Sequence, residues 1–468
     1  VIIASAIAGI NYIAVPHRSD DAPTTWPLRQ LPRWILPEPH PCDGRFPTKS
    51  PAMFGIFATN PDESLCASIA WNLWTEGRLA TDLLAGALPG IEHSVYWTPP
   101  FYYLVLAGWQ GLWGPGLLSV RCLSLVLGLA VLVILWQRRR HVGPAAWTAS
   151  AIVIFDPMFQ RAASMGRMDM LAIALTVAAI VVIEHGRSRR RCLAAGTLAA
   201  AALLTHPLGA AAVVAVGLTC LRGRLPAVLP FLLGCAPLLL AWMVYLSLDP
   251  ETFVAQMGLQ LAVKADHARS PIDNVVRLVD FYGSFAAVFV GGFIGGMVGL
   301  LRGRRHLEPW LIGIISLCPV IIFSGELIYP AYLAPFTAVG LCHLLADFRW
   351  GRRALAATVA VFAILNVVDP PPLAGIDPQY QSYCDYVSSH LGSGHSVIVA
   401  VVPDPWFGLQ GRADLRLRLA PPVLIPEDRL RAYVAQADDI VMGGFNPPGF
   451  YPILKNWEEL SAPGQNLW

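Results

Sequence analysis

Long apolar runs, separated by short polar or basic segments, are the main pattern along this chain. Many of these runs approach the roughly 20 residues that a helix needs to cross a bilayer, so they predict a mainly helical, polytopic membrane protein. We expect about eleven crossings, near residues 1–15, 117–137, 144–160, 168–186, 192–206, 207–221, 225–248, 284–301, 308–324, 329–346 and 354–368. The first run is short for a crossing, and a leading signal peptide is its alternative interpretation.

Arginine-rich clusters indicate which ends of these helices face the cytoplasm. Five clusters follow apolar runs, at residues 138–141, 187–191, 222–224, 302–305 and 349–353. By the positive-inside rule, all five are cytoplasmic. This orientation requires residues 96–114, YWTPPFYYLVLAGWQGLWG, to form a juxtamembrane or re-entrant helix rather than a crossing. The outer face then carries residues 16–116, 161–167, 249–283 and 369–468.

Residues 60–77, NPDESLCASIAWNLWTEG, predict a short amphipathic helix that lies along the outer membrane surface. Its apolar residues recur every four positions, as on one face of a helix. Two acids, Asp62 and Glu63, stand at its start. A helix cap explains both, because Asn60 can act as the capping residue and Glu63 completes a capping box.

The last hundred residues change in character and predict a small α/β domain over residues 369–468. HSVIVAVV (395–402) and DDIVMGGF (438–445) are typical of buried strands, and PEDRLRAYVAQA (426–437) is typical of a helix. We expect this domain to lie outside the membrane as a lid or acceptor-binding module, with a purely structural cap as the alternative. Residues 1–368 then form the membrane domain, including the outer loops 16–116 and 249–283.

Composition agrees with a membrane protein and excludes several functions. Of the 468 residues, 55% are hydrophobic and 14% charged, and the mean hydropathy is +0.53. A net charge of +2 is too small to indicate nucleic-acid binding. Zinc motifs are absent. Phosphate-binding loops are absent too, so ATP is not the expected energy source. Nine cysteines are present, and one disulfide is plausible among the three outside the predicted spans, Cys42, Cys66 and Cys384.

A third acid, Asp169, opens a predicted span directly after an outward loop that contains Arg161 and Arg167. Capping against the helix dipole is one explanation for it. An acid at this depth is costly unless it faces a polar cavity, so a functional role is the other. We expect Asp62 and Asp169 to converge on one outward-facing site.

Four motifs in this order resemble a known family: NPDES, YWTPPFYYLVLAGWQGLWG, GRMDM and YPAYLAPFTAVG. The order over residues 55–345 is similar to GT-C class membrane glycosyltransferases, in particular the protein O-mannosyltransferase and aminoarabinose transferase group. Members of this group transfer a sugar from a polyprenyl phosphate carrier. The resemblance implies that Asp62 matches the catalytic acid, with Glu63 beside it, and that Asp169 matches the second acid.

Transfer from such a donor needs a base for the acceptor hydroxyl or amine and cations for the departing phosphate. An outer-face carboxylate supplies the base. The candidate phosphate ligands are Arg161, Arg167, Lys264, His267 and Arg269. His206, before a proline, is another candidate, with helix capping as the simpler role.

Further substrate-binding candidates stand in two other motifs. GIEHSVYWTPP offers Glu92, His93 and Tyr96, whereas Tyr329 and Tyr332 could line the donor cavity or anchor a span end at the interface. A divalent cation is an additional prediction, with carboxylate and imidazole ligands from Asp62, Glu63, Glu92 and His93.

The expected function is therefore sugar transfer from a polyprenyl phosphate to a glycan, lipid or protein acceptor, at the outer face of a bacterial inner membrane. A non-catalytic GT-C-like subunit of a larger membrane assembly is the first alternative. A secondary transporter is the second, although the inverted repeat and broken helices typical of that class are not found in the sequence. The sequence identifies neither the sugar nor the acceptor.

Overall fold

The computed structural model describes residues 61–138, 145–222, 225–266, 270–283, 286–324, 326, 328–346, 350–368, 378–399, 404–420, 425, 432–441 and 466–467. The chain divides into two compact units, Val1–Pro51 and Ala52–Trp468, and every described residue belongs to the second. The first predicted span, residues 1–15, lies outside the described residues.

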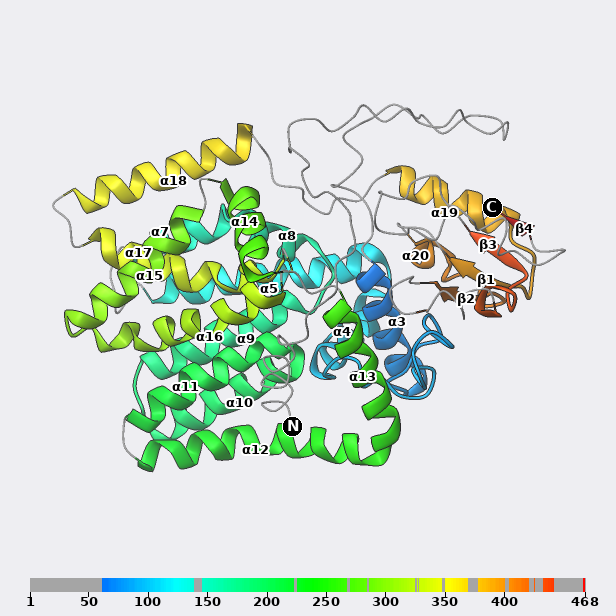
Figure 1. The fold of residues 1–468 in the computed structure, drawn as a ribbon, viewed down its shortest axis with the longest axis horizontal. Coiled ribbons are helices and arrows are strands. Elements are labelled where there is room, and N and C mark those ends of the chain that lie inside the picture. The colour runs from blue at the N-terminus through cyan, green and yellow to red at the C-terminus, as the bar shows by residue number, and fades with distance from the viewer. Residues whose placement is uncertain are drawn as a thin grey trace, which may run out of the picture. The chain divides into compact units, whose positions relative to one another are not determined.

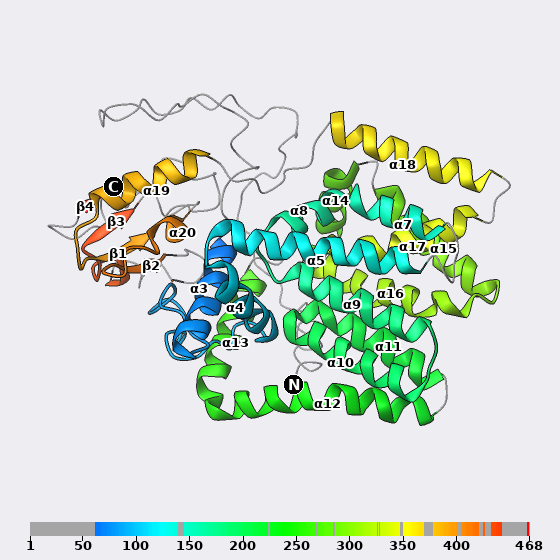
Figure 2. The same ribbon diagram turned by 180° about the vertical axis from the view of Figure 1, so that it is seen from behind.

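Apolar helices make up most of the described chain (Figure 1). Their bounds, up to the last apolar helix, are α3 Pro61–Glu76, α4 Phe101–Trp113, α5 Leu117–Gln137, α7 Ala145–Ile154, α8 Pro157–Ser164, α9 Asp169–Glu184, α10 Arg189–Thr205, α11 Ala210–Arg222, α12 Leu225–Leu248, α13 Pro250–Asp266, α14 Pro271–Tyr282, α15 Ala286–Leu301, α16 Glu308–Ser324, α17 Ala334–Ala346 and α18 Gly351–Val368. Helix α9 packs against α5, α10 and α11, and Figure 2 shows α5 running beside it.

Three of the described helices are long and apolar enough to cross a membrane: Leu117–Gln137, Pro226–Leu248 and Arg305–Ser324. A fourth candidate is the pair α8 and α9, which is bent by 117° at a short break and so forms a broken span or a re-entrant loop. A mainly helical membrane protein is therefore confirmed. The count of eleven crossings stays a prediction. Helix α4 has only 13 residues, in keeping with the juxtamembrane or re-entrant helix expected at residues 96–114.

Near the C-terminus the described residues form a four-stranded parallel sheet with the order β2-β1-β3-β4. The elements here are α19 Pro378–His390, β1 Ser396–Val399, α20 Trp406–Leu409, β2 Arg416–Leu419, β3 Asp439–Val441 and β4 Asn466–Leu467. Strands β1 and β3 fall within the two predicted strand segments, and residues 432–434 of the predicted helix are helical. Strands β2 and β4 were not predicted.

The sheet region packs against the segment that follows α3. Leu419, at the end of edge strand β2, donates its N–H to the carbonyl of Leu83 at 2.6 Å. Gln410 Nε2 donates to the carbonyl of Pro115 at 3.1 Å. Gly86 has a positive φ of 78°, and a Cβ atom there would lie 3.2 Å from the ring of Tyr433. These contacts tie the C-terminal sheet to residues 83–115.

Candidate functional site

The two acids at the start of α3 occupy opposite environments. The side chain of Asp62 is 48% exposed, whereas that of Glu63 is fully buried. Neighbours on a helix point about 100° apart, which is why adjacent carboxylates can face solvent and core. Asn60 lies outside the described residues, so the predicted capping box is not tested.

Glu63 forms a buried ion pair with Arg121 of α5. Nε and Nη2 of Arg121 donate to Oε1 and Oε2 of Glu63, each at 2.8 Å. The backbone N–H of Gly166 also donates to Oε1, at 2.7 Å. A Cβ atom at Gly166 would lie 2.4 Å from Cγ1 of Val120, so only glycine allows this close approach. Glu63 therefore joins α3 to α5 and to the break between α8 and α9.

Arg167, in the same break, bridges the other two acids. Its Nη1 contacts Oδ2 of Asp62 at 2.5 Å, and its Nε contacts Oδ2 of Asp169 at 2.9 Å. The expected convergence of Asp62 and Asp169 is thus observed, through one guanidinium that contacts both carboxylates. Asp169 is fully buried and Arg167 is 16% exposed, so only Asp62 in this trio presents a large exposed surface.

The local sequence explains how this trio forms. Asp169 lies in the first turn of α9, where a carboxylate interacts favourably with the helix dipole. The chain bends by 117° between α8 and α9, and Gly166 and Arg167 at this break contact the two acids of α3. Asp169 therefore lies both in the first turn of α9 and in a polar cluster, whereas the N-cap position is Met168 and no side-chain capping hydrogen bond forms there.

Aromatic residues of a 3₁₀ helix, η5 Tyr329–Tyr332, surround the buried side of the trio. The hydroxyl of Tyr332 donates to Oδ1 of Asp169 at 3.2 Å. The ring of His206 lies 5.3 Å from Tyr329 and 5.5 Å from Tyr332. Nδ1 of His206 accepts from the N–H of Leu208 at 3.2 Å, as the simpler capping role predicts.

The predicted phosphate ligands differ in what they already contact. Lys264, in the last turn of α13, forms an ion pair with Glu326, and both side chains are about half exposed. Arg161, in the last turn of α8, is partly buried and close enough to Arg167 for their charges to repel. In the described part of the chain, Arg161 makes no ion pair. His267 and Arg269 lie outside the described residues.

The structure gives Glu92, His93 and Tyr96 local or packing contacts. Nε2 of His93 lies 3.9 Å from Oε1 of Glu92. Tyr96 is 2% exposed and packs its ring against Tyr245 at 5.0 Å and Phe253 at 6.1 Å. Tyr96 thus belongs to an aromatic cluster beside α12 and α13.

The predicted metal and disulfide have no support in the described geometry. Over the ranges that the structure describes, no three His, Cys, Asp or Glu side chains gather closely enough to hold a metal ion. Cys66 and Cys384 are both buried free thiols, so a disulfide between these two is not formed. Cys42 lies outside the described residues.

Asp404, which the sequence analysis did not single out, contacts the residue after the acidic pair. The hydroxyl of Ser64 donates to Oδ2 of Asp404 at 2.8 Å, and the N–H of Trp406 donates to Oδ1 at 3.1 Å. Burial raises the pKa of the Asp404 carboxyl to about 7, against these hydrogen bonds, which lower it. No local pattern marks Asp404, because 340 residues separate it from Ser64.

Comparison with solved structures identifies the fold. The chain matches the apo crystal structure of ArnT from Cupriavidus metallidurans with a TM-score of 0.56 and 14% identity, over 88% of each chain. It matches ArnT bound to undecaprenyl phosphate with a TM-score of 0.50 and 18% identity, over 69% of this chain and 63% of that one. An oligosaccharyltransferase from Archaeoglobus fulgidus, tethered with an acceptor peptide, aligns with a TM-score of 0.48 and 10% identity, over 78% of this chain and 60% of that one.

The chain therefore has the fold of the GT-C class of membrane glycosyltransferases, as its motifs suggested. Within that class, its fold is similar to that of ArnT. No family model matches the sequence. A search of curated proteins also finds no match.

Proposed function

We propose that this protein is a glycosyltransferase that moves a sugar from a polyprenyl phosphate donor to an acceptor hydroxyl or amine. The similarity in fold to ArnT, which has been crystallised with undecaprenyl phosphate, supports the donor class. The proposal places the site on the outer face of a bacterial inner membrane, in a protein with eleven crossings and an extracytoplasmic C-terminal domain.

The observation that carries this proposal is the exposure of Asp62. Of the three acids, Glu63 and Asp169 are fully buried, whereas Asp62 is 48% exposed and can be reached from water. Asp62 acts as the base: it takes the proton of the acceptor, whose oxygen or nitrogen forms the new bond to the anomeric carbon. The bond from that carbon to the phosphate oxygen breaks, and polyprenyl phosphate leaves with the electron pair.

The other residues of the site position Asp62 and hold the donor. Tyr332 holds Asp169, Asp169 orients Arg167, and Arg167 in turn fixes the carboxylate of Asp62. Arg161, close to Arg167, is the first candidate phosphate ligand, because it makes no ion pair among the described residues and can offer its guanidinium donors to the departing group. Lys264, His267 and Arg269 are further phosphate ligands, and Tyr329 lines the donor cavity.

Two measurements test this function. Mass spectrometry of the lipid that copurifies with the full chain should detect a polyprenyl phosphate or its glycosylated form, which also names the sugar. Turnover of that donor should fall at least about a thousandfold in Asp62→Asn, because removal of the base leaves only binding and electrostatic stabilisation. Thermal stability should change little, since Asp62 is half exposed.

Glu76→Gln is the matched control. Glu76 is an exposed acid at the other end of the same helix, paired with an arginine, Arg78, and its loss should change turnover less than about twofold. Near-normal turnover in Asp62→Asn contradicts the assignment of the base. A wild-type chain that binds the donor and never transfers its sugar instead supports the non-catalytic subunit.

A further inference from the structure

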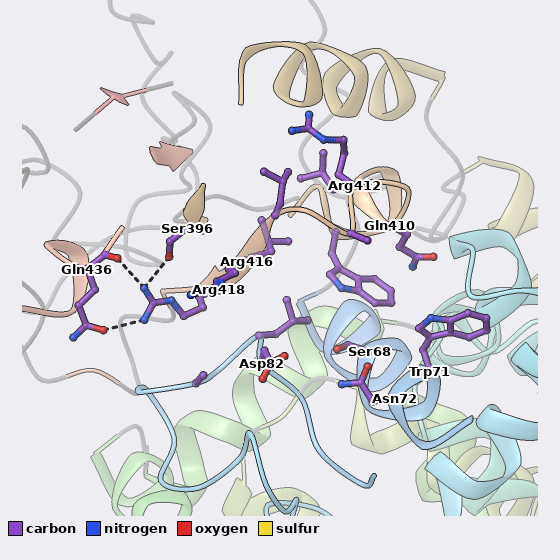
Figure 3. A pocket seen from close by; sticks show the side chains of 17 residues that line it. Ser68, Trp71, Asn72, Asp82, Ser396, Gln410, Arg412, Arg416, Arg418 and Gln436 are labelled. Atoms are coloured by element: carbon purple, nitrogen blue, oxygen red, sulfur yellow. Dashed lines mark hydrogen bonds between the residues drawn. The ribbon is translucent and has the colours of Figure 1, made fainter. Parts of the chain in front are cut away.

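A pocket of about 790 Å³ lies between helix α3 and the C-terminal sheet (Figure 3). One wall carries Trp71 and Asn72 of α3 together with Asp82 of the following segment. The opposite wall consists of β2 and of the residues around α20, and includes Arg416 and Arg418. The size is typical of a small-molecule site, which occupies about 300–1,000 Å³. Two parts of the chain that are more than 300 residues apart thus enclose one concave surface.

The walls of this pocket carry an excess of positive charge. Three arginines line it, Arg412, Arg416 and Arg418, against a single acid, Asp82. Arg412 is paired with Asp414 at 2.9 Å. Among the described residues, Arg416 makes no ion pair, and it is exposed. The pocket therefore presents at least one guanidinium that can bind an anionic ligand.

Neighbouring contacts hold Arg418 in a fixed orientation. Its Nη2 donates to Oγ of Ser396 at 3.1 Å and its Nη1 donates to Oε1 of Gln436 at 3.0 Å. Its guanidinium also lies over the ring of Tyr433, 5.3 Å from the centroid. Figure 3 shows Arg416 and Arg418 side by side on β2, across from Asp82 and α3. Preorganised donors of this kind lose little conformational entropy when a ligand binds.

Aromatic and amide side chains also line the pocket, beside aliphatic ones: Leu83, Ala85, Leu409, Ala413, Leu415 and Leu417. Two indoles, Trp71 and Trp406, offer flat apolar faces that can stack on the C–H face of a sugar ring. The amide nitrogens of Asn72 and Gln410 donate to the carbonyls of Ala80 and Pro115, each at 3.1 Å, and the amide oxygen of Gln436 accepts from Arg418 at 3.0 Å. The other end of each amide is of the kind that pairs with hydroxyl groups. Indoles, amides and guanidinium groups in one pocket are the chemistry that recognises a saccharide with a negative charge.

The pocket also lies on the helix that carries Asp62. Ser68 and Asn72, which line it, follow Asp62 by six and ten residues, so they lie roughly 9 and 15 Å further along the axis of α3. Residues 63–67 of α3 are buried apart from the half-buried Leu65, so the pocket and the Asp62 carboxylate lie on separate surfaces of this helix. The pocket is therefore placed to hold a part of an acceptor that is some sugar units away from the reacting group.

We propose that this pocket binds an anionic sugar, carrying a carboxylate or a phosphate, within a glycan acceptor. That the glycan is the acceptor rests on the proposed function. That the pocket binds the glycan rests on the pocket alone. Arg416 and Arg418 contact the anionic group, Trp71 and Trp406 stack on the ring, and the reacting end of the glycan reaches Asp62, roughly 9–15 Å away along the axis of α3.

Binding of defined oligosaccharides to the full chain in nanodiscs tests the proposal, with tetragalacturonate and a phosphorylated oligomannose as anionic probes and maltotetraose as the neutral probe. Both anionic probes should bind at least tenfold more tightly than maltotetraose, and 0.5 M salt should reduce the difference. Arg416→Ala should weaken the anionic probes at least tenfold and leave maltotetraose unchanged. The matched control is Arg78→Ala, because Arg78 is an exposed arginine outside the pocket. This variant should bind all three probes as tightly as the wild type does.

Several results would overturn the proposal. These are equal affinity for the neutral and anionic probes, wild-type affinity in Arg416→Ala, absence of binding to all three probes, or binding of polyglutamate as tight as that of the anionic glycans. Asp62→Asn should retain wild-type affinity while losing turnover. A wild-type chain that binds the anionic probes and transfers no sugar contradicts the proposed function and supports the pocket as a glycan site.

Discussion

Helix α9 begins and ends with a carboxylate bound to an arginine, and the two contacts differ in their surroundings. At the start, Arg167 contacts the buried Asp169 and also the half-exposed Asp62. At the end, Arg138 binds both oxygens of Glu184, at 2.7 and 2.6 Å, and both side chains are at most 5% exposed.

The end of α9 is closed further by an aromatic ring. The guanidinium of Arg138 lies 4.6 Å from the centroid of Trp310, which covers it. An ion pair that is buried, bidentate and covered can stabilise packing and has no surface for a substrate. The start of α9 keeps one carboxylate in reach of water. The difference between the two ends is exposure, and exposure distinguishes a site for chemistry from a structural contact.

After Asp62→Asn, removal of the shared arginine at the start of α9 should have the largest effect. Arg167→Gln separates Asp62 from Asp169, and we expect turnover to fall by about a hundredfold to a thousandfold, as when one preorganised polar group is lost from an active site. The turnover of Arg167→Lys should lie between that of Arg167→Gln and that of the wild type, because an ammonium cannot reproduce the forked donor geometry of a guanidinium. Single-turnover rates measure this effect, and equal rates in all three proteins would contradict a role for the bridge.

Loss of the acid at the end of α9 should affect stability instead. Glu184→Gln leaves Arg138 buried without its charged partner, which costs about 3–5 kcal/mol. Turnover per folded molecule should stay within about twofold of the wild type. Denaturant titration measures the first quantity and donor turnover the second. A fall in turnover with unchanged stability would show that both ends of α9 serve the reaction.

Glu63→Gln sharpens the comparison. Glu63 is adjacent to Asp62 in the sequence, but like Glu184 it is buried and paired with a buried arginine. A simple helix cap would predict a loss of about 1 kcal/mol or less. The buried pair with Arg121 predicts a larger loss, about 3–5 kcal/mol, with measurable turnover in the folded fraction. The same titration distinguishes the two values, and a loss below about 1 kcal/mol would favour the cap.

Asp404→Asn should show its effect as a change in the pH dependence of stability. The pKa of Asp404 is about 7 in the folded chain and near 3.8 when unfolded, so the folded state binds the proton more tightly. Asp404 therefore contributes stability at low pH, and this contribution is lost as the pH rises from about 4 to about 7. Melting temperatures between pH 4 and 8 should fall less steeply in Asp404→Asn than in the wild type. Parallel curves would contradict the raised pKa.

The sequence predicted most helices because their signal is local. The apolar run 117–137 coincides with α5, and the predicted run 225–248 coincides with α12. Composition over a window of this length is enough to define such a helix. Strand β2 was missed, although RLRL alternates with a period of two, because a four-residue run with two arginines carries a weak apolar signal.

The candidate site was predictable only in part. Resemblance and position singled out Asp62 and Asp169, and the structure joins them through Arg167. The partner of Glu63 could not be predicted, since 58 residues separate it from Arg121 and no periodicity connects them. Contacts of this kind depend on how helices pack, which one sequence does not reveal.

The docking of the C-terminal sheet also bears on how this protein can be recombined with its relatives. In a chimera, the transferred sheet would need its three partners in the N-terminal segment. These are the carbonyl of Leu83 for edge strand β2, the glycine at Gly86 for Tyr433, and the hydroxyl of Ser64 for Asp404. We therefore expect the two contacting segments, residues 64–86 and 404–433, to be interchangeable between relatives only when both are exchanged together. A chimera that exchanges only the later segment should assemble poorly, and one that exchanges both should retain its native junction.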